Sequence, residues 1–195
     1  MFAINSSTSP IFGDPNAGSE IRVVFSPDGG ESWNAPLTIA PSTTADPQHV
    51  HPALTLTQNG NRVWIAYYVQ QLDEKLRTDL ALLHIDGNQL RLDQTTGLSN
   101  TAFDLAPTNI TLSPTHTTNY DRAFNACYGI GEYMSVTGDQ RGNSSTDGVV
   151  SAWGDNRNKW TGPIGSAAPY THAQADVFFG RVGTQLDVIG SLTPY

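Results

Sequence analysis

The sequence predicts an all-β protein built from repeated four-stranded antiparallel units, and three observations support this. Charged residues make up only 14% of the 195 residues, while Gly (18) and Pro (12) are plentiful, a composition that suits many short strands joined by turns. No stretch carries apolar residues at helical spacing, so little helix is expected. Short apolar segments recur in a fixed order, which indicates a repeat architecture. A chain of this length can bury a sizeable core.

The clearest repeats are three short strands that each begin with a carboxylate, at residues 20–25, 79–84 and 176–181. Two other segments, residues 62–67 and 148–153, share the pattern x-Val-x-x-Ala-aromatic. Their nearly continuous apolar character predicts strands that are covered on both faces.

Together with their neighbouring strands, these segments form a unit of four strands, which we call A to D. The unit occurs twice in full and once without its first strand. Four-stranded units side by side are typical of β-propeller blades. We expect a partial blade at residues 1–45, a blade at 46–115 and a blade at 120–195, about two and a half blades in one domain. The segment Asn109–Leu112 fits this order either as an outer strand or as part of a loop. The predicted strands are 2–4, 20–25 and 37–39, then 52–57, 62–67, 79–84 and 90–92, then 132–137, 148–153, 176–181 and 186–189.

A motif between the last two strands of the first unit carries a family resemblance. The segment Ser26–Trp33 reads Ser-x-Asp-x-Gly-x-x-Trp, which resembles the Asp-box, or BNR repeat, of sialidase-like propellers. The Asp28 carboxylate can accept backbone N–H bonds across a tight turn, and Gly29 and Gly30 allow positive φ. The indole of Trp33 should be largely buried beside the turn. The box is structural in that family, so Ser26, Asp28, Gly30 and Trp33 are predicted to be structural residues.

The resemblance extends to the second half of the chain and sets the functional expectation. Gly131–Tyr133, Val150–Arg157 and Ala175–Phe179 look like segments of sialidase-like proteins. The family implies a six-bladed propeller, so either a longer chain or several chains complete the ring. It also implies carbohydrate recognition, with exo-α-sialidase-type hydrolysis in a full-length protein and an extracellular or cell-surface location. The family's Arg-Ile-Pro segment does not occur in these 195 residues, so no catalytic residue is assigned and activity stays open.

Strand direction predicts where a ligand would bind. In an antiparallel blade the A–B and C–D turns lie at one end and the B–C and D–A loops at the other. The Asp-box belongs to the first end, whereas the second end gathers charged and aromatic groups that suit a sugar. The fork of Arg157 is the best anchor for an acidic sugar, with pairing to Asp155 as the alternative. The candidate ligand-binding residues are Arg157, Asp155, Tyr67, Tyr68, Glu132, Arg122 and His172; Asp46, His49, His51, Asp121, Asn156 and Asp176 belong to the same end.

Other chemistry-bearing residues have structural interpretations. Glu20, Asp79 and Asp176 recur at equivalent strand starts, which favours a structural role. His49 and His51 lack a third ligand and are expected to be surface residues, and Cys127 alone excludes an internal disulfide. We therefore predict no metal and no cofactor.

Charge and open edges constrain the partners. The net charge of -8 argues against nucleic acid, and no segment is apolar enough to span a membrane. Two alternatives to a sugar-binding protein remain: a non-catalytic propeller that binds a protein or polymer, and a structural repeat of a surface protein. Open blade edges would allow self-association.

Overall fold

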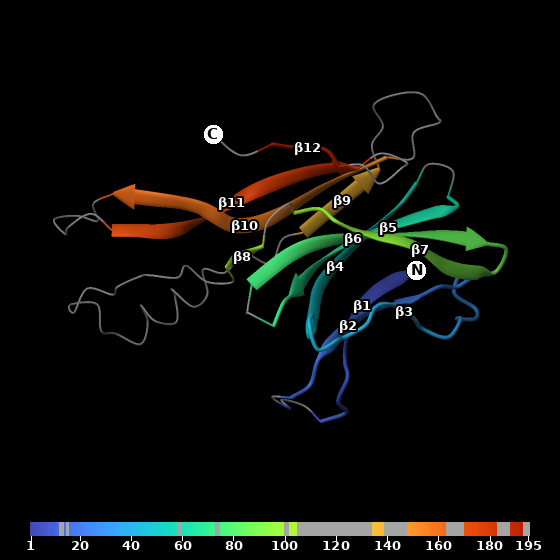
Figure 1. Cartoon of the computed structure of the whole chain (residues 1–195). Helices are drawn as coiled ribbons and strands as arrows, with labels where there is room; N and C mark the ends of the chain where they lie inside the picture. Colours follow the sequence, from blue (N-terminus) through green and yellow to red (C-terminus); the bar gives the residue numbers. More distant parts are fainter. Residues whose placement is uncertain are drawn as a thin grey trace.

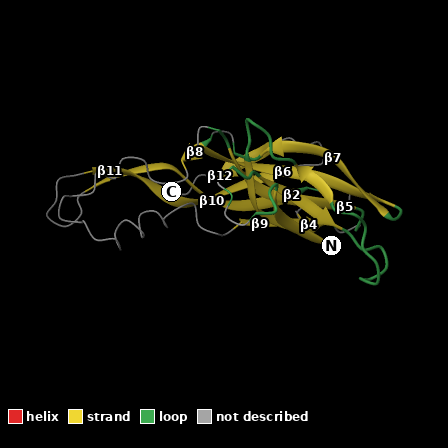
Figure 2. Ribbon diagram, turned by 90° about the horizontal axis from the view of Figure 1, so that it is seen from below, coloured by secondary structure: helices red, strands yellow, loops and turns green. Residues whose placement is uncertain are grey.

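The described part of the computed structural model consists of twelve strands in three antiparallel sheets (Figures 1 and 2). It covers residues 1–11, 14, 16–57, 60–72, 75–99, 102–104, 134–138, 148–162, 170–182 and 188–192. The backbone but not the side chains is described at residues 104, 156–162, 170–176 and 188–192. Within these ranges no residue is helical, and no helix is long and apolar enough to cross a membrane. The all-β class is confirmed.

The strand order within the three sheets follows the predicted repeat. Sheet 1 has the order β1-β2-β3, sheet 2 the order β4-β5-β6-β7 with β8 beside the start of β6, and sheet 3 the order β9-β10-β11-β12. Only the two-residue β8 has no counterpart among the predicted strands. Sheet 1 comprises β1 (Phe2–Ser7), β2 (Ser19–Val24) and β3 (Leu37–Ala40). Sheet 2 comprises β4 (Gln48–Leu56), β5 (Arg62–Gln70), β6 (Lys75–Asp86), β7 (Gln89–Gly97) and β8 (Phe103–Asp104). Sheet 3 comprises β9 (Met134–Gly138), β10 (Val149–Gly162), β11 (Tyr170–Val182) and β12 (Val188–Leu192).

Sheet 2 is buried on both faces, because it lies between the other two sheets (Figure 1). Successive side chains of β5 point to opposite faces, as strand geometry requires. Its odd-numbered residues, among them Val63 and Ile65, form one core with sheet 1, and its even-numbered residues, among them Trp64 and Ala66, form a second core with sheet 3. The expectation that Val63 and Val149 are buried is confirmed.

An aromatic stack within sheet 3 and one hydroxyl bonded between sheets 2 and 3 belong to the second core. Trp153 of β10 stacks on Phe178 of β11 with ring centroids 6.4 Å apart. A side chain at Gly180 would bring its Cβ to 3.0 Å from Trp153 Cζ3, so glycine is what allows the indole to lie there. The Tyr68 hydroxyl accepts a hydrogen bond from Gly154 N (2.9 Å) and donates one to Gly154 O (3.1 Å).

The turn of the Asp-box forms as predicted, but its tryptophan does not lie where predicted. The Ser32 amide donates to Asp28 Oδ1 (2.9 Å) and the Gly30 amide to Ser26 Oγ (2.7 Å). Gly29 and Gly30 have φ of 77° and 104°, which glycine adopts without strain. Trp33 is 46% exposed, because its ring stacks on Phe2 (5.3 Å between centroids) on the outer face of sheet 1 rather than inside a core.

We expect Tyr68→Phe to lower the free energy of unfolding by about 1–3 kcal/mol, because the buried Gly154 amide would lose its acceptor. Urea denaturation measures the change. Tyr67→Phe is the matched control on the same strand: its hydroxyl bonds the exposed Thr95 side chain, which water can solvate, so the loss should be smaller. Equal losses in the two variants would contradict the role assigned to Tyr68.

Candidate functional site

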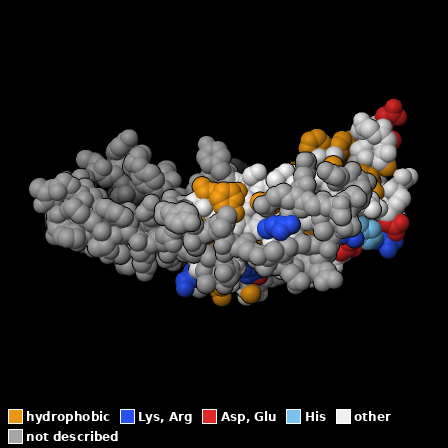
Figure 3. Space-filling model, turned by 90° about the horizontal axis from the view of Figure 1, so that it is seen from above, with side chains coloured by type: hydrophobic (Ala, Val, Ile, Leu, Met, Phe, Trp, Pro, Cys, Tyr) orange, Lys and Arg blue, Asp and Glu red, His pale blue; other side chains and the backbone are white. Residues whose placement is uncertain are grey.

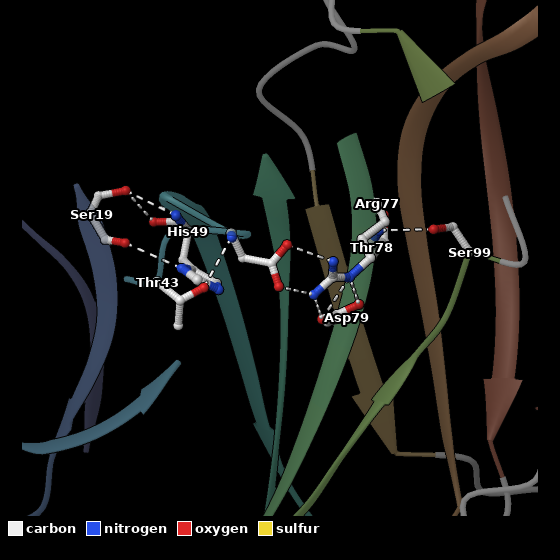
Figure 4. Close-up of polar contacts among 8 residues, drawn as sticks. Ser19, Thr43, His49, Arg77, Thr78, Asp79 and Ser99 are labelled. Atoms are coloured by element: carbon white, nitrogen blue, oxygen red, sulfur yellow. Dashed lines mark hydrogen bonds and ion pairs between the residues drawn. The ribbon is translucent and has the colours of Figure 1, made fainter. Parts of the chain in front are cut away.

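A polar cluster of Asp46, His49, Arg77 and Asp79 lies between sheets 1 and 2, at the end where β5 leads into β6 (Figure 4). Asp46 and His49 were predicted at this end. Asp79 was predicted to be structural, and Arg77 was not singled out. The cluster therefore combines two expected residues with an arginine that spacing alone did not reveal.

Arg77 binds both carboxylates of the cluster. Its Nη1 and Nη2 donate to the two oxygens of Asp46 at 2.8 and 2.9 Å. Its Nε donates to both oxygens of Asp79 at 3.0 and 3.1 Å, and Nη2 adds a third contact to Asp79 at 3.0 Å. This two-sided contact uses the planar fork of the guanidinium fully.

The two aspartates differ because they are buried to different depths. Hydrogen bonds from Arg77 lower the pKa of Asp46, which lies nearer the solvent. Burial raises the pKa of Asp79 despite the same partner, since removing a carboxylate from water outweighs the attraction. Hydrogen bonds from Asp46 in turn raise the pKa of Arg77. The single cation is thus balanced by two carboxylates and offers no free positive charge to an anionic ligand.

His49 links β4 to β2 instead of facing solvent, so its prediction as a surface residue is wrong. Its amide donates to Ser19 Oγ (2.9 Å), its carbonyl accepts from Ser19 Oγ (2.9 Å), and its Nδ1 lies 3.2 Å from Ser19 O. Burial lowers the pKa of the imidazole, so the neutral ring with a proton on Nδ1 fits this contact. His51 is exposed, has φ of 53° at a bulge in β4, and turns its ring toward Tyr68. The two histidines do not converge.

Tyr67 and Tyr68, two of the candidate ligand-binding residues, are not exposed at the end of the sheet as expected. Both are buried, and they point to opposite cores because they are neighbours on one strand. Burial raises the pKa of both phenols, that of Tyr68 to about 12. Asp155 is also fully buried and accepts a hydrogen bond from Trp153 Nε1 at 3.3 Å.

The remaining candidates stay predictions. Arg157 and Asn156 follow Asp155 on β10, next to a bulge between Asp155 and Asn158, while His172 and Asp176 belong to β11; their side chains lie outside the described part. Arg122, Glu132, Asp121 and Cys127 lie outside the described residues altogether.

A groove of about 470 Å³ adjoins the polar cluster, and we call it the loop groove. Its wall is tied to the cluster, since Asp46 N donates to Thr43 Oγ1 and Thr43 N to Asp46 O, both at 3.0 Å. None of the residues that line it is charged, and most carry amide or hydroxyl groups. They are Asn16, Ala17, Gly18, Ser42, Thr43, Thr44, Pro47, Gln48, Gln70, Gln71 and Leu72.

Close backbone packing shapes the loop groove. A Cβ on Gly18 would lie 1.9 Å from Ser42 Oγ, so only glycine fits there. Pro47 O accepts hydrogen bonds from Ser19 N (3.0 Å) and Ser42 Oγ (2.9 Å), and Gln48 Nε2 donates to Ala17 O (2.9 Å). The sequence signal for this groove is modest: two polar uncharged runs, residues 42–44 and 70–71, placed at loop ends.

A second groove, of about 510 Å³, lies at the opposite end of sheets 1 and 2, near the Asp-box. Asn34 Nδ2 donates to Asn88 O at 2.7 Å across it. Its lining includes Val23, Phe25, Leu37 and Leu90. For metals, the described residues contain no group of three His, Cys, Asp or Glu side chains that could hold an ion.

We expect Arg77→Gln to lower the free energy of unfolding by about 1.5–3 kcal/mol, because Asp79 would stay buried without its charged donor. Arg22→Gln is the control: Arg22 binds Glu20 in a similar pair, with Nε 2.6 Å from Oε1, but it is more exposed and serves one carboxylate. Chemical denaturation should give a smaller loss for the control, and equal losses would show that the second carboxylate adds nothing.

The buried His49 should make stability depend on pH. Because its pKa in the folded protein is lowered from 6.5, the stabilisation is complete above pH 6.5 and is lost as the pH falls through the folded pKa. Between pH 7.5 and 5.5 the free energy of unfolding should fall more steeply in wild type than in His49→Gln, by at most about 1.4 kcal/mol per pH unit. Both proteins keep Asp46, Asp79 and Arg77, so the difference isolates the imidazole. Identical slopes would contradict a buried neutral ring.

Comparison with known proteins adds no family assignment. No protein-family model matches the chain, and neither the curated proteins nor the solved structures give a match. The resemblance to Asp-box propellers therefore stays a prediction that rests on the segment Ser26–Trp33 and on the order of the strands.

Proposed function

We propose that this chain is a segment of a sialidase-like Asp-box β-propeller and that it recognises carbohydrate in the loop groove. The observation that carries the proposal is the uncharged, hydrogen-bonding lining of that groove. The groove lies at the end formed by B–C and D–A connections, away from the Asp-box turn.

The propeller assignment draws support from how the sheets repeat. Each sheet uses the same antiparallel strand order, and each of the two cores joins one sheet to the next along the chain. The turn at Ser26–Trp33 has the hydrogen bonds and positive φ values that an Asp-box requires.

The groove chemistry fits a neutral sugar. Sugar hydroxyls donate and accept hydrogen bonds, and the amides of Gln70 and Gln71 and the hydroxyl of Thr44 can do both. Pro47 and Leu72 add apolar surface for the C–H face of a sugar ring. A volume of about 470 Å³ falls within the range of roughly 300–1,000 Å³ usual for small-molecule sites.

Charge favours a neutral over an acidic sugar at this groove. The neighbouring cluster holds two carboxylates against one arginine, and the chain has a net charge of -8. An acidic sugar would instead need Arg157, the predicted anchor on β10. Binding is proposed here rather than hydrolysis, because Asp46 and Asp79 are both engaged by Arg77 and neither is placed to act as a general acid or base.

Titration with neutral hexoses and oligosaccharides tests the proposal. Gln71→Ala and Thr44→Ala should each weaken binding about 2- to 10-fold, the effect of one neutral hydrogen bond. Gln89→Ala, in the groove at the opposite end, is the matched control and should bind like wild type. Isothermal titration calorimetry gives the dissociation constants.

Sialic acid and Arg157→Lys complete the experiment. Binding of sialic acid that Arg157→Lys weakens, with no binding of neutral sugars, would move the site from the loop groove to β10. Failure of every sugar to bind would contradict carbohydrate recognition and favour a propeller that binds a protein or polymer.

A further inference from the structure

Two of the segments that line the loop groove are not neighbours in the chain. One is the connection from β3 to β4, residues 41–47, which we call the wall loop. The other is the end of β5 with the residues that follow it. The wall loop contributes Ser42, Thr43, Thr44 and Pro47 to the lining, and the second segment contributes Gln70, Gln71 and Leu72. A ligand that spans both segments loses affinity when their spacing is not fixed in advance.

Arg77 connects these two segments. It lies on β6 beside Val69, the residue before Gln70, and its guanidinium donates to both oxygens of Asp46 in the wall loop at 2.8 and 2.9 Å (Figure 4). Asp46 in turn makes two hydrogen bonds with Thr43, from Asp46 N to Thr43 Oγ1 and from Thr43 N to Asp46 O, both at 3.0 Å. A continuous series of contacts thus runs from the strand beside Gln70 to a residue that lines the groove.

The guanidinium is a stiffer tie than the backbone supplies nearby. Leu72 N donates to Ala45 O at 2.9 Å, and a single hydrogen bond leaves the loop free to rotate about it. Two parallel N–H bonds from a guanidinium instead fix the plane of the carboxylate that accepts them. Asp79 holds the other side of Arg77, since it accepts from Nε at 3.0 and 3.1 Å. The arginine is therefore fixed on its own strand and transmits that position to the wall loop.

Arg77 is turned toward its two carboxylates rather than toward the groove. Its Nε, Nη1 and Nη2 all donate to Asp46 or Asp79, and it does not line the groove. On the molecular face shown in Figure 3, the described Lys and Arg side chains are scattered and form no basic patch. An uncharged ligand would therefore feel Arg77 through the segments that it holds.

We propose that Arg77 is a positioning residue for the loop groove: by holding Asp46, it fixes the wall loop at the spacing from Gln70 and Gln71 that a neutral sugar bridges. This inference rests on the proposed function, because it concerns the same groove. Asp79 alone would balance the charge of Arg77, so the added contact with Asp46 serves to link strand and loop.

Calorimetric titration with a neutral oligosaccharide tests the proposal. Asp46→Asn is the central variant: it leaves Arg77 its bonds to Asp79, and it keeps both bonds to Thr43, which use the backbone of residue 46. The dissociation constant should rise about 3- to 10-fold, the usual range for a residue that acts without touching the ligand. Asp46→Glu, which keeps the carboxylate, should stay within about 2-fold of wild type.

Glu20→Gln is the matched control. It breaks the Arg22–Glu20 pair, in which Nε lies 2.6 Å from Oε1, and neither side chain lines the groove. This variant should bind sugar like wild type. Circular dichroism at the titration temperature confirms that each variant is folded, because loss of global stability does not change the dissociation constant of molecules that are folded.

A double-mutant cycle shows whether Arg77 acts through Asp46. Arg77→Gln should also weaken binding, and Arg77→Gln with Asp46→Asn should bind no more weakly than Arg77→Gln alone, because both changes break one contact. Hydrogen exchange of the sugar-free protein reports on the loop itself. The amides of Thr43 and Leu72 should exchange faster in Asp46→Asn than in wild type.

The outcomes separate this inference from the proposed function. Sugar binding that Asp46→Asn leaves unchanged, an Asp46→Glu variant as weak as Asp46→Asn, additive losses in the cycle, weakened binding in the control, or unchanged exchange at Thr43 and Leu72 would each overturn the inference alone. Failure of wild type to bind any neutral sugar would overturn the proposed function and this inference together.

Discussion

The structure depends on one constraint: the middle sheet has to be covered on both faces. Strand β5 is apolar at nearly every position, so neither of its faces can meet water without exposing large side chains. Burial at about 25 cal/mol per Å² makes two packed neighbours the stable arrangement. Sheets 1 and 3 supply that cover.

The need to cover sheet 2 on both faces also explains which site residues could be predicted from the sequence and which could not. The strands were predictable because short apolar runs and the turn residues between them are local features that recur along the chain. The burial of Tyr67 and Tyr68 depends on packing against neighbouring sheets, which the local sequence does not reveal. Because the two residues are adjacent on one strand, the sequence alone did require that they point to opposite faces. Arg77 was not predicted because its partner Asp46 lies 31 residues away along the chain, and only folding brings the two side chains together. Its second partner, Asp79, lies two residues away on the same strand. The burial of Trp33 could not be predicted from the motif, because it depends on what packs on the outer face of sheet 1, where the ring stacks on Phe2 and stays partly exposed.

At the end that carries the loop groove, charged side chains pair with one another and uncharged side chains line the groove. Arg77 pairs with the partly exposed Asp46 and the buried Asp79, which leaves one carboxylate in excess and joins a loop to a strand. The groove beside them is left with uncharged donors and acceptors. A groove lined by uncharged groups beside an excess carboxylate would select ligands by hydrogen-bond geometry and disfavour anions, which is the discrimination that a neutral sugar requires.

The Tyr68 hydroxyl and the Ser19 hydroxyl have a shared mechanical consequence. Each takes part as donor and acceptor in a buried contact between neighbouring sheets, Tyr68 with Gly154 and Ser19 with His49. Both contacts sit at the end of the stack that holds the groove. The two contacts fix the spacing of the three sheets at the groove end, while Asn34 Nδ2 and Asn88 O join sheets 1 and 2 at the other end. A ligand in the groove would then meet a surface already in its binding shape and would forfeit little entropy on docking.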